Sequence, residues 1–210
     1  MIKSGQKTIE QLGKLFGSEA QVKCMRLLLN YPDRVFALTE LAEKARISRF
    51  QLRQAVHSLK SVGFCIDHEV TVKKKLKNGK TQTRKVAGIE LKKTYPLIPH
   101  LHNLLIGGGV ILPEEVQSLF SRVGKVYMLT LSGLFLRDND RMLDLMIVGD
   151  HVQPGALLRA VRTLESEIGH EVRYALFSVK EYHYRMAMYD KLLRDMFDYP
   201  HIKVIDKIRK

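Results

Sequence analysis

Apolar side chains recur at helical spacing in the first half of the chain. Residues 18–31 open with Ser18 and Gln21 at the spacing of a capping box and stop before Pro32. This predicts a first helix with the apolar stripe Ala20, Val22, Met25, Leu28 and Leu29. Residues 38–45 predict a short second helix, with Thr39 as its N-cap and an apolar side made of Leu38, Leu41, Ala42 and Ala45.

A third helix is predicted from Ser48, which forms a second capping box with Gln51, to Gly63, which ends it. Its inward stripe is Leu52, Val56, Leu59 and Val62. Its other side is polar and basic and carries Arg49, Gln51, Arg53, Gln54, His57 and Lys60. Residues 46–48 form a tight turn before it. Two short helices joined in this way, the second one basic, match a helix-turn-helix.

Residues 65–93 hold two strand-like runs around Asn78-Gly79, the dipeptide most favoured in a type I′ hairpin turn. A hairpin directly after a recognition helix is a wing. Its tip is dense in cations that suit phosphate contacts: Lys73, Lys74, Lys75, Lys77, Lys80, Arg84 and Lys85. With helix, helix, helix and wing in this order, residues 12–95 resemble the winged helix-turn-helix domains of prokaryotic transcription regulators.

Each of these features also has a purely structural explanation. A polar helix face is often only solvated, and a lysine-rich hairpin often protects a sheet edge from aggregation. Their order along the chain favours nucleic-acid binding. Phe50 has two interpretations, packing beneath the wing or contact with a thymine methyl group.

The second half predicts a different domain. A linking helix is expected from about Pro99 to Ile106, followed by Gly107-Gly108-Gly109 as the best domain boundary and by a helix that begins at Pro113. Strands are then predicted at residues 125–131, 142–150, 171–177 and 201–206. Helices are predicted at residues 154–169 and from Ser178, with Glu181 as capping partner. This order implies a small α/β domain with helices on a mixed sheet.

Charge separates the two halves further. The chain of 210 residues carries a formal net charge of +13. Residues 1–106 hold 20 Lys and Arg against 8 Asp and Glu, whereas residues 107–210 hold 15 against 14. The excess of positive charge therefore lies in the half that resembles a winged helix, and a polyanion such as double-stranded DNA becomes the first candidate partner.

Other features exclude several classes of protein. Cys24 and Cys65 lie at no metal-ligand spacing and are expected to be buried free thiols in a reducing cytosol. His100 and His102 fall on different sides of a helix, so no metal site is expected there. The N-terminus lacks the apolar core of a signal peptide, and no apolar run approaches the roughly 18 residues of a membrane span. A soluble, cytoplasmic protein without a cofactor is expected.

"DLMIVGD", "EIGHEVRYALFSVKEY" and "MFDYPHIKVID", in the order of elements given above, resemble the minimal nucleotidyltransferase domain over about residues 119–206. Prokaryotic proteins join such a domain to an N-terminal winged helix. The resemblance implies a two-domain α+β and α/β fold: a winged helix at residues 1–95, a linker helix region at 96–118 and a degenerate nucleotidyltransferase-like domain with a mixed sheet at 119–210.

The resemblance also implies a site in which a Gly-Ser turn approaches a triphosphate and two acids, two residues apart on a strand, hold divalent metals. Here Asp144 matches the second acid, but Met142 stands at the first and Arg173 near a third. Ser132-Gly133 lies near the expected turn in reverse order. We therefore expect no catalytic residues, no metal and no nucleotidyl transfer. Asp138 and Asp140, which could in principle reach a metal, are interpreted as a polar turn.

The sequence thus predicts a DNA-binding transcription regulator, expected as a homodimer, whose second domain is an inactive scaffold for dimerisation, a protein partner or a small ligand. The predicted DNA contacts are the cations of the wing together with Ser48, Arg49, Gln51, Arg53, Gln54, His57 and Lys60 of the third helix. "YHYRMAMYDKLLRDMFDYP" is rich in residue types that favour interfaces, although a Met and aromatic stripe is more often core. Two alternatives stay open. One is an active metal-dependent nucleotidyltransferase that modifies RNA or protein. The other is a non-specific chromatin or RNA-binding accessory protein.

Overall fold

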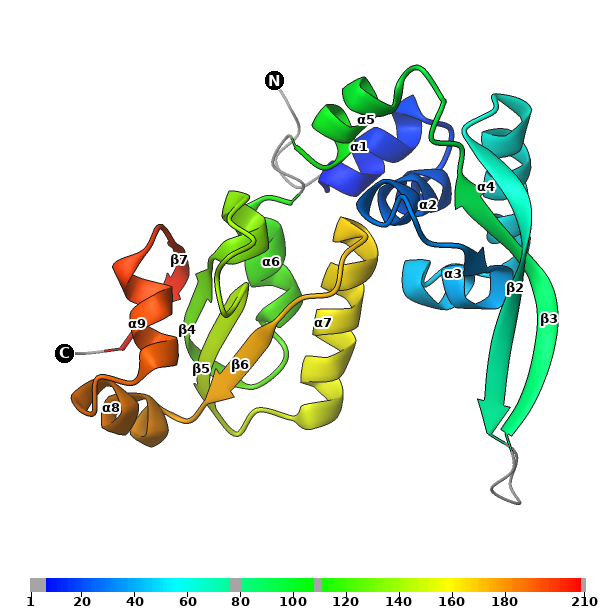
Figure 1. Ribbon diagram of the computed structural model, residues 1–210. Coiled ribbons are helices and arrows are strands. Elements are labelled where there is room, and N and C mark those ends of the chain that lie inside the picture. The colour runs from blue at the N-terminus through cyan, green and yellow to red at the C-terminus, as the bar shows by residue number, and fades with distance from the viewer. Residues whose placement is uncertain (1–6, 76–80, 108–110, 209–210) are drawn as a thin grey trace. The chain divides into compact units, whose positions relative to one another are not determined.

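The structure is a computed structural model that describes residues 7–75, 81–107 and 111–208. These residues form two compact units of helices and strands, each with its own sheet (Figure 1). The first unit contains the described residues up to Gly107 together with Ser166–His170, and the second contains the remainder. A mixed α and β fold is confirmed. Gly108 and Gly109 of the expected domain boundary lie outside the described residues.

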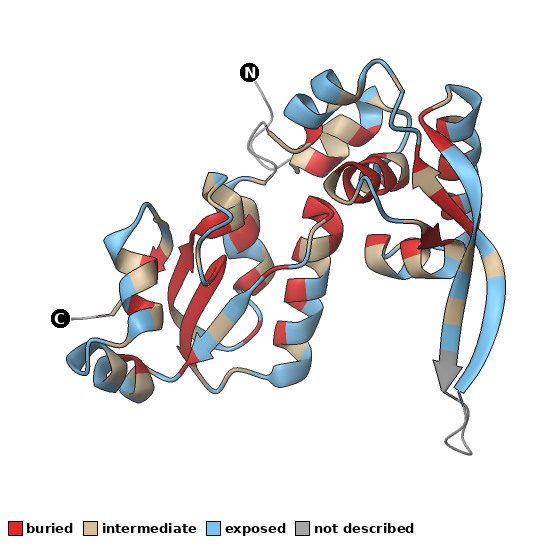
Figure 2. Cartoon of the chain, viewed as in Figure 1, coloured by how far each residue is buried: buried red, intermediate tan, exposed pale blue. Residues whose placement is uncertain are grey.

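The helices of the first unit surround one apolar core. Their bounds are α1 Thr8–Leu15, α2 Glu19–Asn30, α3 Leu38–Ala45, α4 Arg49–Ser61 and α5 Ile98–Leu105. α2 lies at the centre and is buried along most of its length (Figure 2). The expected linking helix corresponds to α5, whose Leu105 is part of this core. The helix α1 was not predicted from the sequence, although Ile9, Leu12 and Phe16 pack on the core at helical spacing.

Side-chain caps fix where two of these helices begin. The Ser18 hydroxyl accepts the N–H of Gln21, and Ser48 and Gln51 form both halves of a capping box. Thr39 was wrongly predicted as a cap. The N-cap of α3 lies two residues earlier, at Ala37, and makes no side-chain hydrogen bond, because the chain enters the helix directly from a paired strand.

A three-stranded antiparallel sheet with the order β1-β3-β2 completes the first unit. Its strands are β1 Phe36–Ala37, β2 Cys65–Lys75 and β3 Thr81–Leu91. β2 and β3 pair without a break from Cys65 opposite Leu91 to Lys75 opposite Thr81, which confirms the two strands of the predicted hairpin. Asn78-Gly79 lies outside the described residues. The two-residue strand β1 was not predicted because it is too short to show an alternating pattern.

The second unit is built on a four-stranded mixed sheet, as expected. The sheet order is β6-β5-β4-β7, with β5 and β6 parallel and the other pairs antiparallel. The strands are β4 Lys125–Leu131, β5 Leu145–Asp150, β6 Tyr174–Phe177 and β7 Ile202–Asp206. Its helices are α6 Pro113–Phe120, α7 Pro154–Ile168, α8 Val179–Ala187 and α9 Lys191–Asp198.

Three predictions for the second unit need correction. The strand expected from Met142 begins only at Leu145, and the strand expected from Glu171 begins only at Tyr174. The single helix expected from Ser178 is two helices, because Tyr189 takes a φ of 54° and the Asp190 carboxylate then caps α9. Tyr182 of α8 and Leu193 and Met196 of α9 belong to one apolar core cluster with side chains of the sheet. None of the helices in the described ranges is long and apolar enough to cross a membrane.

Cys24 and Cys65 are free thiols buried in the first unit, as predicted. Burial raises the pKa of Cys24 to about 12 and that of Cys65 to about 11, so both thiols stay protonated near neutral pH. A thiolate is the reactive form of cysteine, so both should react with a thiol reagent only after this unit unfolds. They are therefore built-in reporters of its stability.

Gly88 allows β1 to pair closely with β3. A Cβ at this position would lie 2.7 Å from the carbonyl oxygen of Phe36 and 3.0 Å from Val70 Cγ1. We expect Gly88→Ala to lower the free energy of unfolding of the first unit by about 2 kcal/mol, since backbone must move to admit the methyl group. The measurement is the denaturant midpoint for modification of Cys24 and Cys65. Gly155→Ala in the second unit is the control, and an unchanged midpoint in Gly88→Ala would contradict the prediction.

Candidate functional site

The helix α4 divides cleanly into a buried and an exposed side. Its buried side chains are Leu52, Ala55, Val56 and Leu59. Val62 was predicted to continue this stripe but is 57% exposed, which corrects that prediction. α4 ends at Ser61, and Gly63 with a φ of 75° turns the chain away, so Val62 lies past the last helical turn.

The exposed side of α4 presents polar groups that are free to bind a partner. Arg49, Arg53, Gln54 and His57 are exposed, and none of them bonds through its side chain to another described residue. α4 contains no acid. A surface of free donors without competing carboxylates suits an anionic ligand with base edges.

Ser48 and Gln51, also predicted as DNA contacts, have a structural role. The Gln51 Oε1 atom accepts the Ser48 N–H at 2.9 Å, and the Ser48 hydroxyl accepts the Gln51 N–H at 3.2 Å. Gln51 can still donate through its amide nitrogen, but its amide oxygen already accepts one hydrogen bond that holds it against the start of the helix. Bidentate binding of adenine needs both groups of the amide. Of the two glutamines, Gln54 is therefore the better base-reading candidate.

The ion pair of Lys60 shows which side of α4 faces the hairpin. Its ammonium pairs with Asp67 of β2 on the protein surface. Arg53 and Arg49 lie seven and eleven residues before Lys60, spacings that place all three on the same flank of a helix. The two arginines therefore lie on the hairpin side of α4. Lys60 itself is already paired and is a weaker candidate for phosphate binding.

One end of the hairpin is buried in the core of the first unit, and both faces of its other end are exposed. Ile89 and Leu91 are buried in β3, whereas every residue from Thr81 to Lys85 is exposed. Directly opposed residues in an antiparallel pair share a face, and residues two apart along a strand share it too. Lys73, opposite Thr83, and Lys85, opposite Thr71, are thus on the same face as the buried Ile89 and Leu91.

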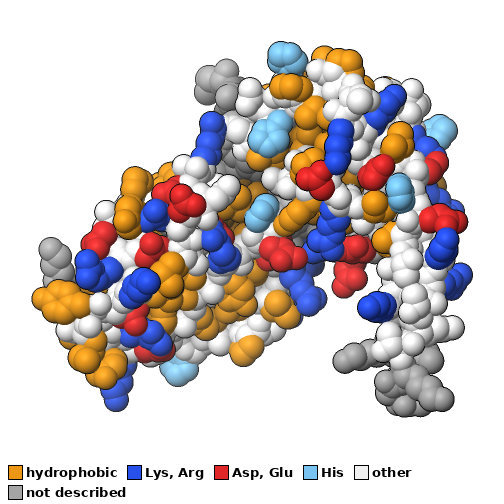
Figure 3. All heavy atoms as spheres, in the orientation of Figure 1, with side chains coloured by type: hydrophobic (Ala, Val, Ile, Leu, Met, Phe, Trp, Pro, Cys, Tyr) orange, Lys and Arg blue, Asp and Glu red, His pale blue; other side chains and the backbone are white. Residues whose placement is uncertain are grey.

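This register gives the exposed half of the hairpin a basic character. Arg84, opposite Val72, lies on the other face and is exposed without a described partner. Lys85 makes an exposed ion pair with Glu69 at 3.3 Å, which should contribute little and exchange readily for a phosphate. Residues 70–89 contain no acid. Figure 3 shows basic side chains along the described part of the hairpin.

Four of the predicted wing lysines cannot be placed as side chains. Lys74 and Lys75 belong to β2, and their side chains are outside the described part of the structure. Lys77 and Lys80 lie outside the described residues altogether. The structure therefore brings Arg49, Arg53, Gln54 and His57 together on α4 and places Lys73, Arg84 and Lys85 on the exposed half of the hairpin.

In the second unit, Asp144 and Arg173 form an ion pair where the resemblance to nucleotidyltransferases implies acids. Asp144 is 1% exposed. Its Oδ1 accepts the Leu134 N–H at 2.9 Å and Arg173 Nη2 at 2.8 Å, while its Oδ2 accepts both the Arg173 N–H and Nε at 2.9 Å. The Asp144 N–H in turn donates to the Arg173 carbonyl at 2.8 Å. This pair was not predicted, although an acid directly before β5 and an arginine directly before β6 indicate it in the sequence.

The environment of Asp144 holds it ionised. Burial alone would raise the pKa of its carboxyl, but the hydrogen bonds from Arg173 and Leu134 and the arginine charge outweigh burial and lower the pKa below its usual value. The same contacts raise the pKa of Arg173. Both oxygens accept two donors each, so the carboxylate has a structural role.

The remaining predicted positions of this site are Ser132, Gly133 and Met142, which lie near the ion pair in the sequence. Ser132 is buried. Gly133 adopts a φ of 51°, and a Cβ there would also collide with Asp144 Oδ1, so both the backbone and the space favour glycine. Met142 is 44% exposed, and its N–H donates to Asp195 at 2.8 Å. Gly133 and Leu134 thus form a turn that packs directly against the carboxylate of the ion pair.

The acids of the neighbouring turn are also engaged locally. Asp138 pairs with Arg141 at 2.8 Å and accepts the Asp140 N–H at 3.2 Å. Arg141 also pairs with Asp195 at 3.3 Å and lies over the ring of Tyr199, 3.5 Å from its centroid. In the described ranges, no three His, Cys, Asp or Glu side chains are grouped so that they could share a metal ion.

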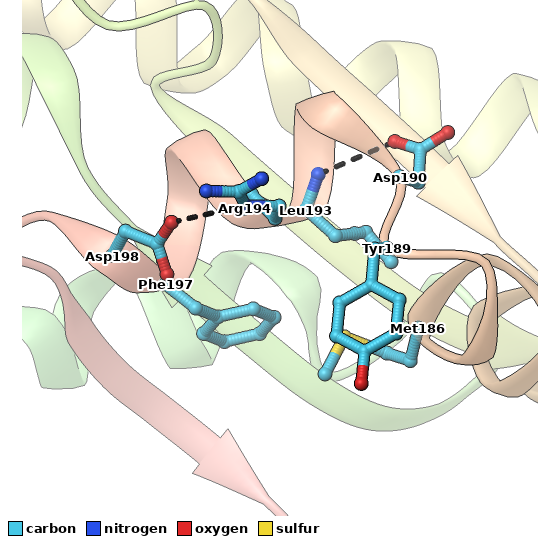
Figure 4. A pocket seen from close by; sticks show the side chains of 7 residues that line it. All are labelled: Met186, Tyr189, Asp190, Leu193, Arg194, Phe197 and Asp198. Atoms are coloured by element: carbon cyan, nitrogen blue, oxygen red, sulfur yellow. Dashed lines mark hydrogen bonds and ion pairs between the residues drawn. The ribbon is translucent and has the colours of Figure 1, made fainter.

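A separate cavity of about 490 Å³ lies beside α8 and α9. Figure 4 shows Tyr189 and Met186 at one end of it and Phe197 at the other, with Arg194 and Asp198 joined as an ion pair. Tyr189 is 81% exposed. The segment expected to mix core and interface residues thus presents several of its aromatic and Met side chains to solvent.

Comparison with known proteins adds no assignment: no protein-family model and no curated protein sequence matches the chain.

The ion pair makes a pH-dependent contribution to stability. We expect Asp144→Asn to lower the free energy of unfolding of the second unit by about 2–3 kcal/mol at pH 7. This is less than for a fully buried pair, since the Arg173 side chain is 47% exposed. Because folding lowers the pKa of Asp144, its contribution is present above the unfolded pKa of about 3.9 and is lost as the pH falls through the folded value.

The deficit of Asp144→Asn should therefore shrink below about pH 4. The measurement is urea unfolding followed by hydrogen exchange of peptides that contain β5, corrected for the intrinsic pH dependence of exchange. Asp140→Asn, at an exposed position in the nearby turn, is the matched control and should stay close to the wild type. An Asp144→Asn deficit that does not vary between pH 3 and pH 7 would rule out this account.

Proposed function

We propose that this protein is a DNA-binding transcription regulator, in which residues 12–95 act as a winged helix. The observation that carries the proposal is the placement of α4. Its acid-free, exposed side holds four polar residues whose side chains bond to no other described residue, and its arginine flank lies beside a hairpin whose exposed half is basic. A duplex has both features that such a surface matches, a major groove of base edges and two rows of phosphates.

The geometry supports different roles for the helix and the hairpin, with base contacts from α4 and phosphate contacts from the hairpin. Gln54 has both groups of its amide free and projects opposite the buried stripe of α4, so it is suited to an adenine edge. Arg49 and Arg53 can read a guanine or bind the backbone. Lys73 and Arg84, on opposite faces of the hairpin, are suited to phosphates, which position the protein without reading sequence.

The second unit is proposed to be a scaffold that does not transfer nucleotides. The bonding of Asp144 to Arg173 supports this proposal, because a metal would have to displace an arginine that donates three hydrogen bonds to the carboxylate through its side chain and backbone. A scaffold of this kind suits homodimerisation, a protein partner or a small ligand. A dimer would present two α4 helices to half-sites about one helical turn of DNA apart.

The proposal predicts different defects for helix and hairpin variants. Lys73→Gln with Arg84→Gln should weaken binding to all duplexes and reduce the slope of log affinity against log salt concentration by about 2, because two phosphate contacts are lost. Arg49→Ala with Gln54→Ala should instead reduce the preference for a selected sequence over random duplex by roughly 10- to 100-fold. The measurement is fluorescence anisotropy on a duplex selected from a random library, over a range of salt concentrations.

Lys180→Gln with Lys191→Gln removes the same charge from exposed positions of the second unit and is the matched control. It should keep both the salt slope and the sequence preference of the wild type. Equal binding of all variants, or tighter binding to random RNA than to any duplex, would refute the proposal.

A further inference from the structure

Phe50 is the one apolar residue of α4 that is exposed to solvent. Its side chain is 67% exposed, whereas the other apolar residues between Arg49 and Ser61 are buried. Of the two interpretations that the sequence allows, packing beneath the hairpin is therefore wrong. A single exposed aromatic ring is common on protein surfaces, so exposure by itself assigns no role.

The position of Phe50 is more informative than its exposure. Phe50, Gln54 and His57 follow each other at spacings of four and three residues, which place them along one line of the helix. This line is opposite the buried stripe of Leu52, Ala55, Val56 and Leu59. Phe50 is also the second residue of α4, and recognition helices contact base edges through their N-terminal residues. The ring thus lies on the part of the helix that contacts base edges in helix-turn-helix proteins.

The chemistry of the major groove offers one clear apolar partner. Most groups on the base edges there are hydrogen-bond donors or acceptors, and the C5 methyl group of thymine is the exception. A phenyl ring gains from covering this methyl group and gains nothing from a polar edge. Gln54 lies four residues further along, a rise of about 6 Å, so the base that it reads is within about two base steps of the thymine.

We propose, resting on the DNA-binding function above, that Phe50 is a specificity-determining residue that contacts a thymine methyl group. The preferred site then contains a thymine within two base pairs of an adenine read by Gln54. The same contact makes the protein discriminate against RNA, because uracil lacks the methyl group. The deep and narrow major groove of an A-form duplex, which side chains cannot read, acts in the same direction.

The experiment replaces thymine by deoxyuridine, which removes only the methyl group. The full chain first selects its site from a random duplex library, and each thymine of the selected duplex is then replaced singly. One replacement should weaken binding of the wild type by roughly fourfold, the effect of one buried methyl-sized group. Phe50→Ala should bind the thymine and deoxyuridine duplexes equally, at about the affinity of the wild type for the deoxyuridine duplex.

Two further variants separate this contact from a general effect of apolar surface. Phe50→Leu keeps an apolar side chain and should retain part of the sensitivity to deoxyuridine. Val62→Ala removes another exposed apolar side chain next to the end of the same helix and should respond like the wild type. Protection of Cys24 from a thiol reagent checks that each variant is folded.

The outcomes distinguish the inference from the function on which it rests. If the wild type binds no duplex, the proposed function fails. If it binds a selected duplex but no thymine position is sensitive to deoxyuridine, only the role of Phe50 fails. Equal sensitivity in the wild type and Phe50→Ala also overturns that role, as does a selected site without thymine.

Discussion

The unbroken register between β2 and β3 is the constraint on which the candidate surface depends. Residues two apart on a strand share a face, so the pairing that buries Ile89 and Leu91 also decides where Lys73 and Lys85 project. A slip of one residue would move these lysines to the other face and expose the apolar pair. Correct burial at one end of the hairpin therefore specifies the arrangement of charge at the other.

The helix α4 is subject to a similar coupling between folding and recognition. Its first turn is held by Ser48 and Gln51, and this leaves Arg49 and Phe50 exposed beside a satisfied cap. A polar residue that completes a cap has less capacity to bind a ligand. Among the polar residues of α4, the best candidates for base contacts are thus those without a structural bond, which the sequence pattern alone did not distinguish.

Local chemistry made much of the fold predictable. Ser48 and Gln51 at one end and Gly63 at the other fixed the bounds of α4, and the strands of the hairpin followed from alternation around a turn signal. The errors share a different cause, because tertiary contacts determine where these helices begin and end. The start of α3 depends on the pairing of β1 with β3, and the separation of α8 from α9 depends on the backbone of Tyr189.

Prediction of the candidate site was uneven for the same reason. Position along the helix was enough to find its exposed polar residues, but it could not show that Gln51 is used in the cap or that Lys60 is paired with Asp67. In the second unit, the match to an acid at Asp144 and the mismatch at Arg173 were both visible. Their bonding required the spatial neighbourhood of two strand ends 29 residues apart.

The pairing of Asp144 with Arg173 also limits how this region could evolve. Exchange of the arginine for an acid would remove the partner of the buried Asp144 and place a second carboxylate beside it. Exchange of Met142 for an acid would add a carboxylate while the arginine still bound the first one. A metal site here therefore requires both replacements, and the loss of the arginine is unfavourable by itself, so the ion pair holds this region in its present chemistry.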